Sequence, residues 1–256
     1  MKPTRWDSGR ESRIVESFSR RVRSYDKHAH LQKAMAERLA SLLPSPLPDT
    51  VLEVGCGTGL FTRHLLARSV RSLVLNDIAP PMIDRLREEM DLPENSRIVV
   101  GNVETSRFPK VDLIVANAVF QWLQNPEETL ARLAGRLSPG GRIAFSVFGP
   151  RTLAEFRETG SLESPALLFP FARWKKILQR AGFQVLEGRS EIRKVFFPSA
   201  LALIKNLQQI GAAPLKMLEA GGLRSLIRKY DAAFSTPQGV YSTWELFYFS
   251  GTRSGP

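Results

Sequence analysis

The chain has 256 residues, a single cysteine and a formal net charge of +11. This length suits one large domain, or one domain with a small subdomain, and the lone Cys56 excludes an intrachain disulfide framework. No apolar run reaches the ~20 residues of a membrane-spanning helix, and the charged N-terminus lacks the apolar core of a secretory signal. We therefore expect a soluble, cytoplasmic, monomeric protein with no membrane partner.

Positive charge is concentrated in the two flanks. Residues 1–33 carry nine Lys/Arg against four Asp/Glu, and residues 151–256 carry fifteen against eight. Residues 34–150 are close to neutral, with twelve against thirteen. The flanks are either an ordinary solvated surface or a face that attracts an acidic partner. Basic and aromatic residues do not interleave in a nucleic-acid-binding motif, so we expect no nucleic acid partner.

The predicted elements begin with helices. Apolar residues recur at helical spacing from Arg13 to Pro44, with a short break expected near Asp26. Strand and helix patterns then alternate, with strands expected at 50–55, 72–77, 96–102, 111–118 and 142–148 and helices at 58–69, 79–90 and 125–141. Repeated strand–helix units predict a parallel sheet covered on both faces. The remaining chain predicts a helix at 171–183, a strand at 185–197, two helices within 199–234 and an aromatic strand at 240–250.

The stretch VLEVGCGTG, residues 51–59, joins the first predicted strand to a helix. A phosphate-binding loop would continue with lysine, and a dinucleotide-binding loop would place its third glycine one residue later. Glu53 would repel a pyrophosphate but suits a ligand with positive charge. S-adenosylmethionine carries an ammonium and a sulfonium group and no phosphate. The alternative is a tight turn that holds no ligand.

The motif EVGCGTG resembles the first motif of class I S-adenosylmethionine-dependent methyltransferases, and the resemblance covers about residues 50–150. It implies that S-adenosylmethionine is the cofactor and S-adenosylhomocysteine the product. It implies a Rossmann-like α/β fold, with a seven-stranded, mostly parallel sheet, an antiparallel last strand and helices on both faces. We expect an N-terminal helical cap at 1–48 and a methyltransferase domain at 49–256, with a helical lid insertion around 198–235. Both the cap and the insertion are expected to cover the site.

The same resemblance assigns roles around the cofactor. Gly55, Gly57 and Gly59 would let the backbone approach the methionyl group, while Glu53 would order the loop or reach the ammonium through water. Asp77 follows Gly59 by 18 residues and is placed to accept hydrogen bonds from the ribose hydroxyls, or else caps a helix. The remaining expected contacts are Ile78 and Met82 near the adenine, the Asn102 carbonyl oxygen and the Val103 N–H at its polar edge, and Asn117 near the methionyl group.

The flanking segments bear on the methyl acceptor. Phe120, Gln121 and Trp122 follow the fourth strand at the edge where open α/β sheets bind ligands, with core packing as the alternative. Four stretches resemble the malonyl-acyl carrier protein O-methyltransferases of biotin synthesis: SFSRRVRSYDKHAHLQ, FQWL, FSVFGPRTLAEFRE and GVYSTWELFYF. The resemblance implies methyl transfer to the free carboxylate of malonyl-acyl carrier protein or malonyl-CoA. Methyltransferases acting on aconitate share part of this pattern, and some relatives are non-catalytic or protein-modifying assembly factors.

The malonyl carboxyl is ionised near neutral pH, so we expect no general base and no catalytic residue of that kind. Histidine and cysteine are too few and too scattered for a metal site, so we expect no metal. Arg151 is the first candidate to hold the carboxylate, with surface solvation as the alternative. Tyr25 and Gln32 are expected to close the acceptor pocket, unless they serve helix packing. An acidic carrier protein would dock on Arg20, Arg21 and Arg23, or on a second basic cluster. The other clusters are Arg173, Lys175, Lys176 and Arg180, and Arg224, Arg228 and Lys229.

Overall fold

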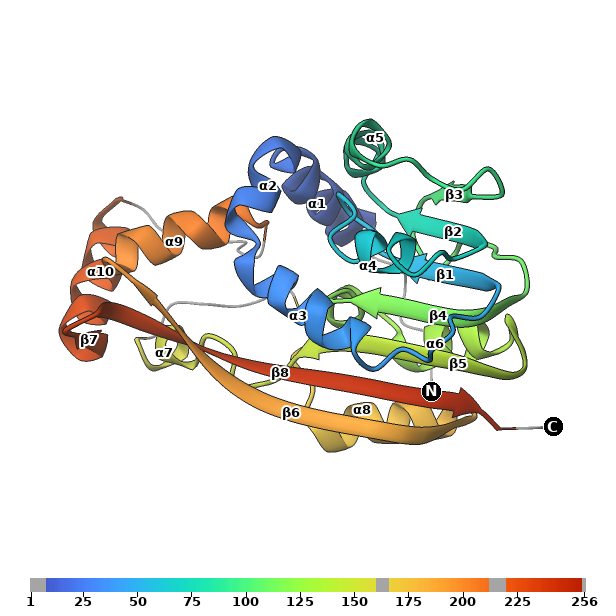
Figure 1. Cartoon of the computed structure of the whole chain (residues 1–256). Helices are drawn as coiled ribbons and strands as arrows, with labels where there is room; N and C mark the ends of the chain where they lie inside the picture. The colour runs from blue at the N-terminus through green and yellow to red at the C-terminus, as the bar shows by residue number, and fades with distance from the viewer. Residues whose placement is uncertain (1–7, 160–165, 212–219, 255–256) are drawn as a thin grey trace.

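Figure 1 shows the computed structural model of the chain, which describes residues 8–159, 166–211 and 220–254. The helices are α1 (Ser8–Ser19), α2 (Val22–His28), α3 (His30–Ala40), α4 (Thr62–Leu66), α5 (Pro80–Glu89), α6 (Pro126–Ala134), α7 (Ala154–Glu158), α8 (Phe171–Arg180), α9 (Ala200–Gln209) and α10 (Ala220–Phe234), with a 3-10 turn η1 at Phe120–Trp122. The strands are β1 (Thr50–Val54), β2 (Ser72–Asp77), β3 (Arg97–Val100), β4 (Val111–Asn117), β5 (Leu137–Phe148), β6 (Phe183–Phe197), β7 (Ser235–Thr236) and β8 (Gly239–Arg253).

The strands form one sheet in the order β3-β2-β1-β4-β5-β8-β6. The first five strands in this order run parallel, and β8 is antiparallel to both of its neighbours, β5 and β6. The predicted fold class is thereby confirmed. The two-residue strand β7, which forms a hairpin with the start of β8, is an addition that the sequence pattern does not predict.

Both faces of the sheet are buried along its central strands, which explains why β1, β2 and β4 are largely apolar runs. The edge strands β3 and β6 keep exposed side chains. In β1, Leu52 and Val54 belong to one hydrophobic cluster and Val51 belongs to the other, as the alternation of strand side chains requires. Helices α6 and α8 pack on the first cluster, and α3, α4, α5 and α9 pack on the second. Figure 1 shows α9, α10 and α7 gathered at one end of the long β6–β8 ribbon.

Several element boundaries differ from the predicted ones. Asp26 lies inside α2, and the helical segment is interrupted at Arg20–Arg21 and at the buried Ala29 instead. The helix predicted at 125–141 ends at Ala134, because the chain from Leu137 onward pairs with β4. The helix predicted from residue 58 begins at Thr62, since Gly59 has a φ of 90° that no right-handed helix accommodates. No described helix has the length and apolarity needed to cross a membrane.

Candidate functional site

The glycine loop after β1 opens onto a large cavity. Gly55 and Gly57 have φ values of 65° and 55°, in the left-handed region that favours glycine. A Cβ atom on Gly55 would overlap the Val119 side chain, whereas one on Gly57 would meet nothing within 4 Å. Both glycines line a cavity with about 860 Å³ of empty space, a figure that includes the solvent at its open mouth. Gly59 does not line this cavity, and a Cβ atom there would overlap Met90, so its bare backbone serves packing of the loop.

The cavity collects most of the predicted cofactor residues. Its lining includes Gly55, Gly57, Asp77, Ile78, Met82, Asn102, Val103 and Asn117, together with two predicted acceptor residues, Tyr25 and Trp122. These residues come from the carboxyl ends of β1, β2 and β4, the segment after β3, the helices α2 and α5, and η1. Parallel strands bring their carboxyl ends to one edge of the sheet, which explains why Gly55, Asp77 and Asn117 meet here.

Asp77 ties the glycine loop to the second strand. Its carboxylate accepts hydrogen bonds from the backbone N–H of Gly57 at 2.9 Å and from that of Ala79 at 2.8 Å. Burial raises the pKa of Asp77, and these hydrogen bonds act in the opposite direction. A carboxylate has about four lone-pair positions, so its two oxygens retain acceptor capacity for ribose hydroxyls.

Glu53 lies beneath the loop and does not line the cavity. Its side chain is 1% exposed, and its Oε2 accepts a hydrogen bond from the Thr62 hydroxyl at 2.8 Å. Burial raises the pKa of this carboxyl to about 8. The contact found is therefore one that joins the sheet to the start of α4 and orders the loop.

Asn102, which follows β3 and is the predicted adenine contact, connects the cavity to helix α1. Its Oδ1 accepts from the Glu104 N–H at 2.8 Å, and its Nδ2 donates to Glu11 Oε2 at 3.1 Å. Glu11, Ile14 and Phe18 line the same cavity from α1. The sequence pattern indicates Ile14 and Phe18 only as part of an amphipathic helix, and Glu11 precedes the predicted helical segment. The Asn102–Glu11 contact that places them spans 91 residues.

Asn117 lies at the end of β4, where the chain meets the N-terminal helices. Its Nδ2 donates to the Gln32 carbonyl oxygen at 3.0 Å, and its Oδ1 accepts from the Ser146 hydroxyl at 2.7 Å. Trp122 packs edge-on against Phe18 with ring centroids 5.7 Å apart. Burial, then the nearby Asp77 charge, raises the pKa of Tyr25, so its hydroxyl stays protonated at neutral pH.

Phe120 and Gln121 lie outside the cavity lining. Phe120 is fully buried against Phe145, with ring centroids 5.0 Å apart. Gln121 Nε2 donates to the Ala118 carbonyl oxygen at 2.7 Å. Phe120 and Gln121 therefore pack in the core, which was the alternative to contact with the methyl acceptor. Gln32 also lies outside this cavity and lines a second one.

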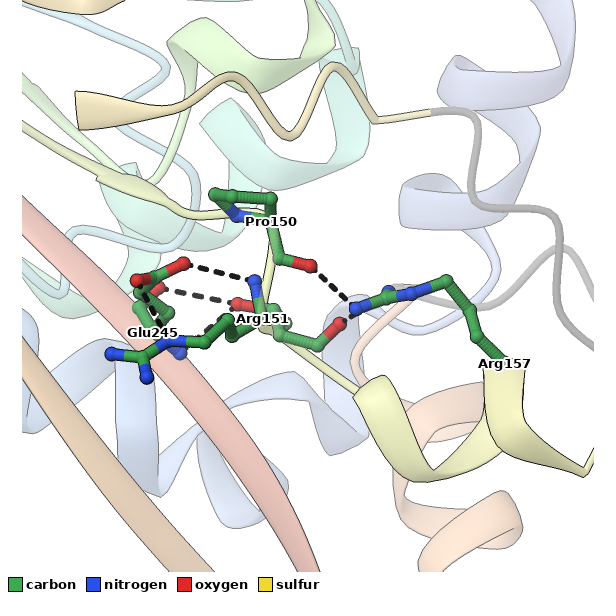
Figure 2. A network of polar contacts seen from close by, with 5 residues as sticks. Pro150, Arg151, Arg157 and Glu245 are labelled. Carbon is green, nitrogen blue, oxygen red and sulfur yellow. Dashed lines mark hydrogen bonds and ion pairs between the residues drawn. The ribbon is translucent and has the colours of Figure 1, made fainter. Parts of the chain in front are cut away.

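Arg151 lines neither cavity, and Figure 2 shows its surroundings. Its side chain is 64% exposed, and its Nε lies 3.1 Å from Glu245 Oε1, while its backbone N–H donates to Glu245 Oε2 at 2.9 Å. Arg157 donates to the carbonyl oxygens of Pro150 and Thr152 and holds the same turn. The two Nη nitrogens of Arg151 have no hydrogen bond or ion pair within the described part of the chain.

The charges around the large cavity suit a cationic ligand. Three carboxyl-bearing residues line it, Glu11, Asp77 and Glu104, and no lysine or arginine is found among the described residues of its wall. A phosphate would be repelled here, whereas an ammonium and a sulfonium group would be attracted. The acidic wall, the open face of Gly57 and the free acceptor capacity of Asp77 fit S-adenosylmethionine.

Comparisons with known proteins agree with this cavity. The family model described as "Methyltransferase domain" matches residues 26–213. A malonyl-[acyl-carrier protein] O-methyltransferase of Ilyobacter polytropus is 33% identical over 209 residues, covering 79% of this chain and 78% of that protein. Another, from Anoxybacillus flavithermus, is 29% identical over 255 residues and covers 93% of this chain and 96% of its own length.

Solved structures support the fold alone. The methyltransferase in a complex with the Trm112 methyltransferase activator of Haloferax volcanii has a TM-score of 0.63 at 19% identity. That match covers 94% of this chain and 96% of the other. With the sheet order, the glycine loop and the acidic cavity, these similarities identify the chain as an S-adenosylmethionine-dependent methyltransferase that belongs to the family of malonyl-[acyl-carrier protein] O-methyltransferases.

Proposed function

We propose that the chain transfers a methyl group from S-adenosylmethionine to the free carboxylate of malonyl-acyl carrier protein. The observation that carries this proposal is the wall of the cavity beyond the glycine loop, where Tyr25, Asn117 and Trp122 converge. These side chains are uncharged, and the raised pKa keeps Tyr25 protonated. A wall of this kind suits an acceptor that is already ionised, because no proton has to be removed before it reacts.

The cofactor supplies an activated methyl group when bound. The chain then has to orient and desolvate the acceptor. In this proposal the Tyr25 hydroxyl donates a hydrogen bond to the carboxylate, while Phe18 and Trp122 exclude water from the reacting atoms. Alignment of two reactants supplies a large part of the rate in such displacements, and removal of water strengthens the attraction between carboxylate and sulfonium.

Arg151 remains the proposed clamp for the carboxylate. Glu245 engages its Nε, which leaves the two Nη nitrogens on the outer side of the guanidinium for a bidentate contact. Because Arg151 does not line the cofactor cavity, this role requires the turn at Pro150–Arg151 to approach the acceptor when it binds.

The test is methyl transfer from labelled S-adenosylmethionine to malonyl-carrier protein, malonyl-CoA and trans-aconitate, measured side by side with intact-mass detection. We expect the highest kcat/KM for the malonyl-carrier protein. Label on trans-aconitate alone would replace this proposal with a small-acid methyltransferase. Tight cofactor binding with no label on any of the three acceptors would favour a non-catalytic or protein-modifying assembly factor.

A further inference from the structure

A second cavity, with about 830 Å³ of empty space when the solvent at its mouth is included, is lined by Gln32. Helices α2 and α3 form one wall, the carboxyl end of β6 forms another, and α9 closes it. Helix α9 is joined to α2 by hydrogen bonds from Ser24 Oγ to Gln209 Oε1 at 2.8 Å and from Asn206 Nδ2 to the His28 carbonyl oxygen at 3.5 Å. The cavity is therefore enclosed between the N-terminal helices and the helical insertion.

The two cavities share a wall made of two residues. Gln32 lines the second cavity, Asn117 lines the cofactor cavity, and Asn117 Nδ2 donates to the Gln32 carbonyl oxygen. The linings of the two cavities are therefore in contact at this pair of residues. A substrate with its reactive end beside Asn117 and its remaining length next to Gln32 would have to pass this hydrogen bond.

In the part of the chain that the structure describes, the lining of the second cavity includes one polar side chain with an unpaired acceptor, Gln32. Gln32 is 6% exposed, and its Oε1 is buried without a hydrogen-bond partner within the described residues. A buried acceptor without a donor is costly, and a ligand N–H would satisfy it. Leu31, Val195, Ile210 and Trp244 supply apolar surface around it.

The rim of this cavity is basic. Exposed His30 and Lys194 lie at its edge, so the cavity reaches the surface there, and Arg193 lines it as well. Arg193 Nε lies 2.8 Å from Glu191 Oε1, and Lys194 Nζ lies 3.9 Å from the centre of the Tyr241 ring. An elongated ligand with amides along its length and a negative charge at its outer end matches this arrangement.

We infer that the second cavity holds the phosphopantetheine arm of the acyl thioester, with an amide N–H on Gln32 and the phosphate at the rim beside Arg193 and Lys194. This inference rests on the proposed function, since the arm is common to an acyl carrier protein and to CoA. It assigns to α3, β6 and α9 the recognition of the arm, separate from the residues that hold the cofactor.

Filling the cavity tests the inference. Ala34 lines it from α3, and Ala34→Phe occupies space that the arm would need. We expect KM to rise about tenfold for malonyl-pantetheine, malonyl-CoA and malonyl-carrier protein alike, since the same arm is displaced in each. For a malonyl thioester of a short thiol, which lacks the arm, KM should rise much less. An unchanged affinity for S-adenosylhomocysteine would show that the variant is folded.

A matched pair of arginines provides a second test that does not depend on the cavity volume. Arg193→Ala removes a rim charge, whereas Arg189→Ala removes an arginine of the same strand that pairs with Glu187 in the same way but lies outside the cavity. We expect Arg193→Ala to raise KM for malonyl-CoA about threefold to fivefold, with a weaker salt dependence, and Arg189→Ala to have no effect.

The outcomes separate this inference from the function on which it rests. An equal rise in KM for thioesters with and without the phosphopantetheine arm would overturn the arm site while leaving malonyl methylation in place. An unchanged KM in both Ala34→Phe and Arg193→Ala would do the same. Failure of the unaltered enzyme to methylate any malonyl thioester would overturn both. An effect on malonyl-CoA without one on the carrier protein would overturn the shared-arm assignment.

Discussion

A carboxyl group buried beneath the glycine loop makes the stability of this fold depend on pH. Burial raises the pKa of Glu53 from its ordinary 4.5 to about 8, and the Thr62 hydrogen bond only partly opposes this. The folded chain then binds this proton more tightly than the unfolded chain does. The free energy of unfolding is therefore expected to fall as pH rises from about 4.5 to about 8 and to level off above that range.

Replacement of Glu53 by glutamine isolates this effect. Glu53→Gln removes the ionisation and keeps an acceptor for the Thr62 hydroxyl. We expect Tm to match the unaltered protein at pH 5 and to exceed it by several degrees at pH 8, since one pKa unit corresponds to about 1.4 kcal/mol. Thermal unfolding at pH 5, 7 and 8 measures this, and the same Tm difference at every pH would contradict it.

Asp77 offers a second prediction. Asp77→Asn replaces one carboxylate oxygen with an amide nitrogen and leaves a backbone N–H of Gly57 or Ala79 without its acceptor. We expect the dissociation constant for S-adenosylhomocysteine to rise at least about tenfold, since hydrogen bonds to charged groups contribute about 1.5–3 kcal/mol. Calorimetric titration checks this, with the exposed Asp84→Asn as the matched control, and equal affinities in the two variants would rule out the ribose role.

At this scale the sequence predicts residues whose place depends on strand ends. Gly57, Asp77 and Asn117 lie at the carboxyl edge because parallel pairing puts every such end there. The sequence does not predict Glu11, whose position depends on how α1 lies across the sheet. It does not predict Glu104 either, whose carboxylate accepts hydrogen bonds from the backbone N–H groups of Gln124 and Asn125. The sequence also does not predict that Gln32 lies outside the cofactor cavity, because its position depends on the hydrogen bond from Asn117 to its carbonyl oxygen.

At the scale of elements, helix α2 is joined to the glycine loop by a side-chain hydrogen bond. The Thr58 hydroxyl donates to Asp26 Oδ1 at 2.5 Å, and Thr58 is buried. Thr58→Val keeps the shape and removes the donor. We expect α2 to exchange its amide hydrogens faster and cofactor affinity to fall about tenfold, because a hydrogen bond to a charged group is lost.

The conservative variant Thr58→Ser, which retains the hydroxyl, controls for the loss of a methyl group. It should preserve both the slow exchange of α2 and most of the cofactor affinity. Fast exchange in the serine variant as well would mean that methyl packing, rather than the bond to Asp26, holds the helix. Hydrogen exchange followed by mass spectrometry on residues 22–28 provides the measurement.

Element boundaries were predictable where a local signal sets them. The strand at 72–77 and the helix start at Pro80 agree with the structure, because apolar runs and proline at a helix N-terminus act locally. The end of α6 was not predictable, because it is set by pairing of Leu137 with Val111 of another strand. The interruption at Ala29 likewise depends on α3 packing on the sheet while α2 covers the cavity.

At the scale of the whole molecule, two of the basic clusters lie on different sides of the sheet. Arg20, Arg21 and Arg23 adjoin the helices that line both cavities, whereas Arg173, Lys175 and Lys176 lie on α8, which packs on the opposite face. Along α2, about 10 Å separates Arg21 from His28 at the second cavity. The N-terminal cluster is therefore the docking site that we propose for an acidic carrier protein.

Charge reversal compares the two clusters. Changing Arg20, Arg21 and Arg23 to glutamate should raise KM for the malonyl-carrier protein about tenfold and flatten its salt dependence, with little change in kcat. The same reversal of Arg173, Lys175 and Lys176 should leave KM unchanged. Steady-state kinetics between about 20 and about 300 mM salt, over which the Debye length falls from roughly 20 Å to roughly 6 Å, distinguish the two variants. An effect of the α8 variant alone would reverse the assignment.

The helices α1 and α2 form one wall of the cofactor cavity. Every turnover has to exchange S-adenosylhomocysteine for a new cofactor, and the cavity that holds it is walled by Glu11, Phe18 and Tyr25. Two hydrogen bonds, from Asn102 to Glu11 and from Thr58 to Asp26, join this wall to the loops beneath it. Both contacts have to break before this wall can move away from the cavity, so we expect variants that lack them to release S-adenosylhomocysteine faster.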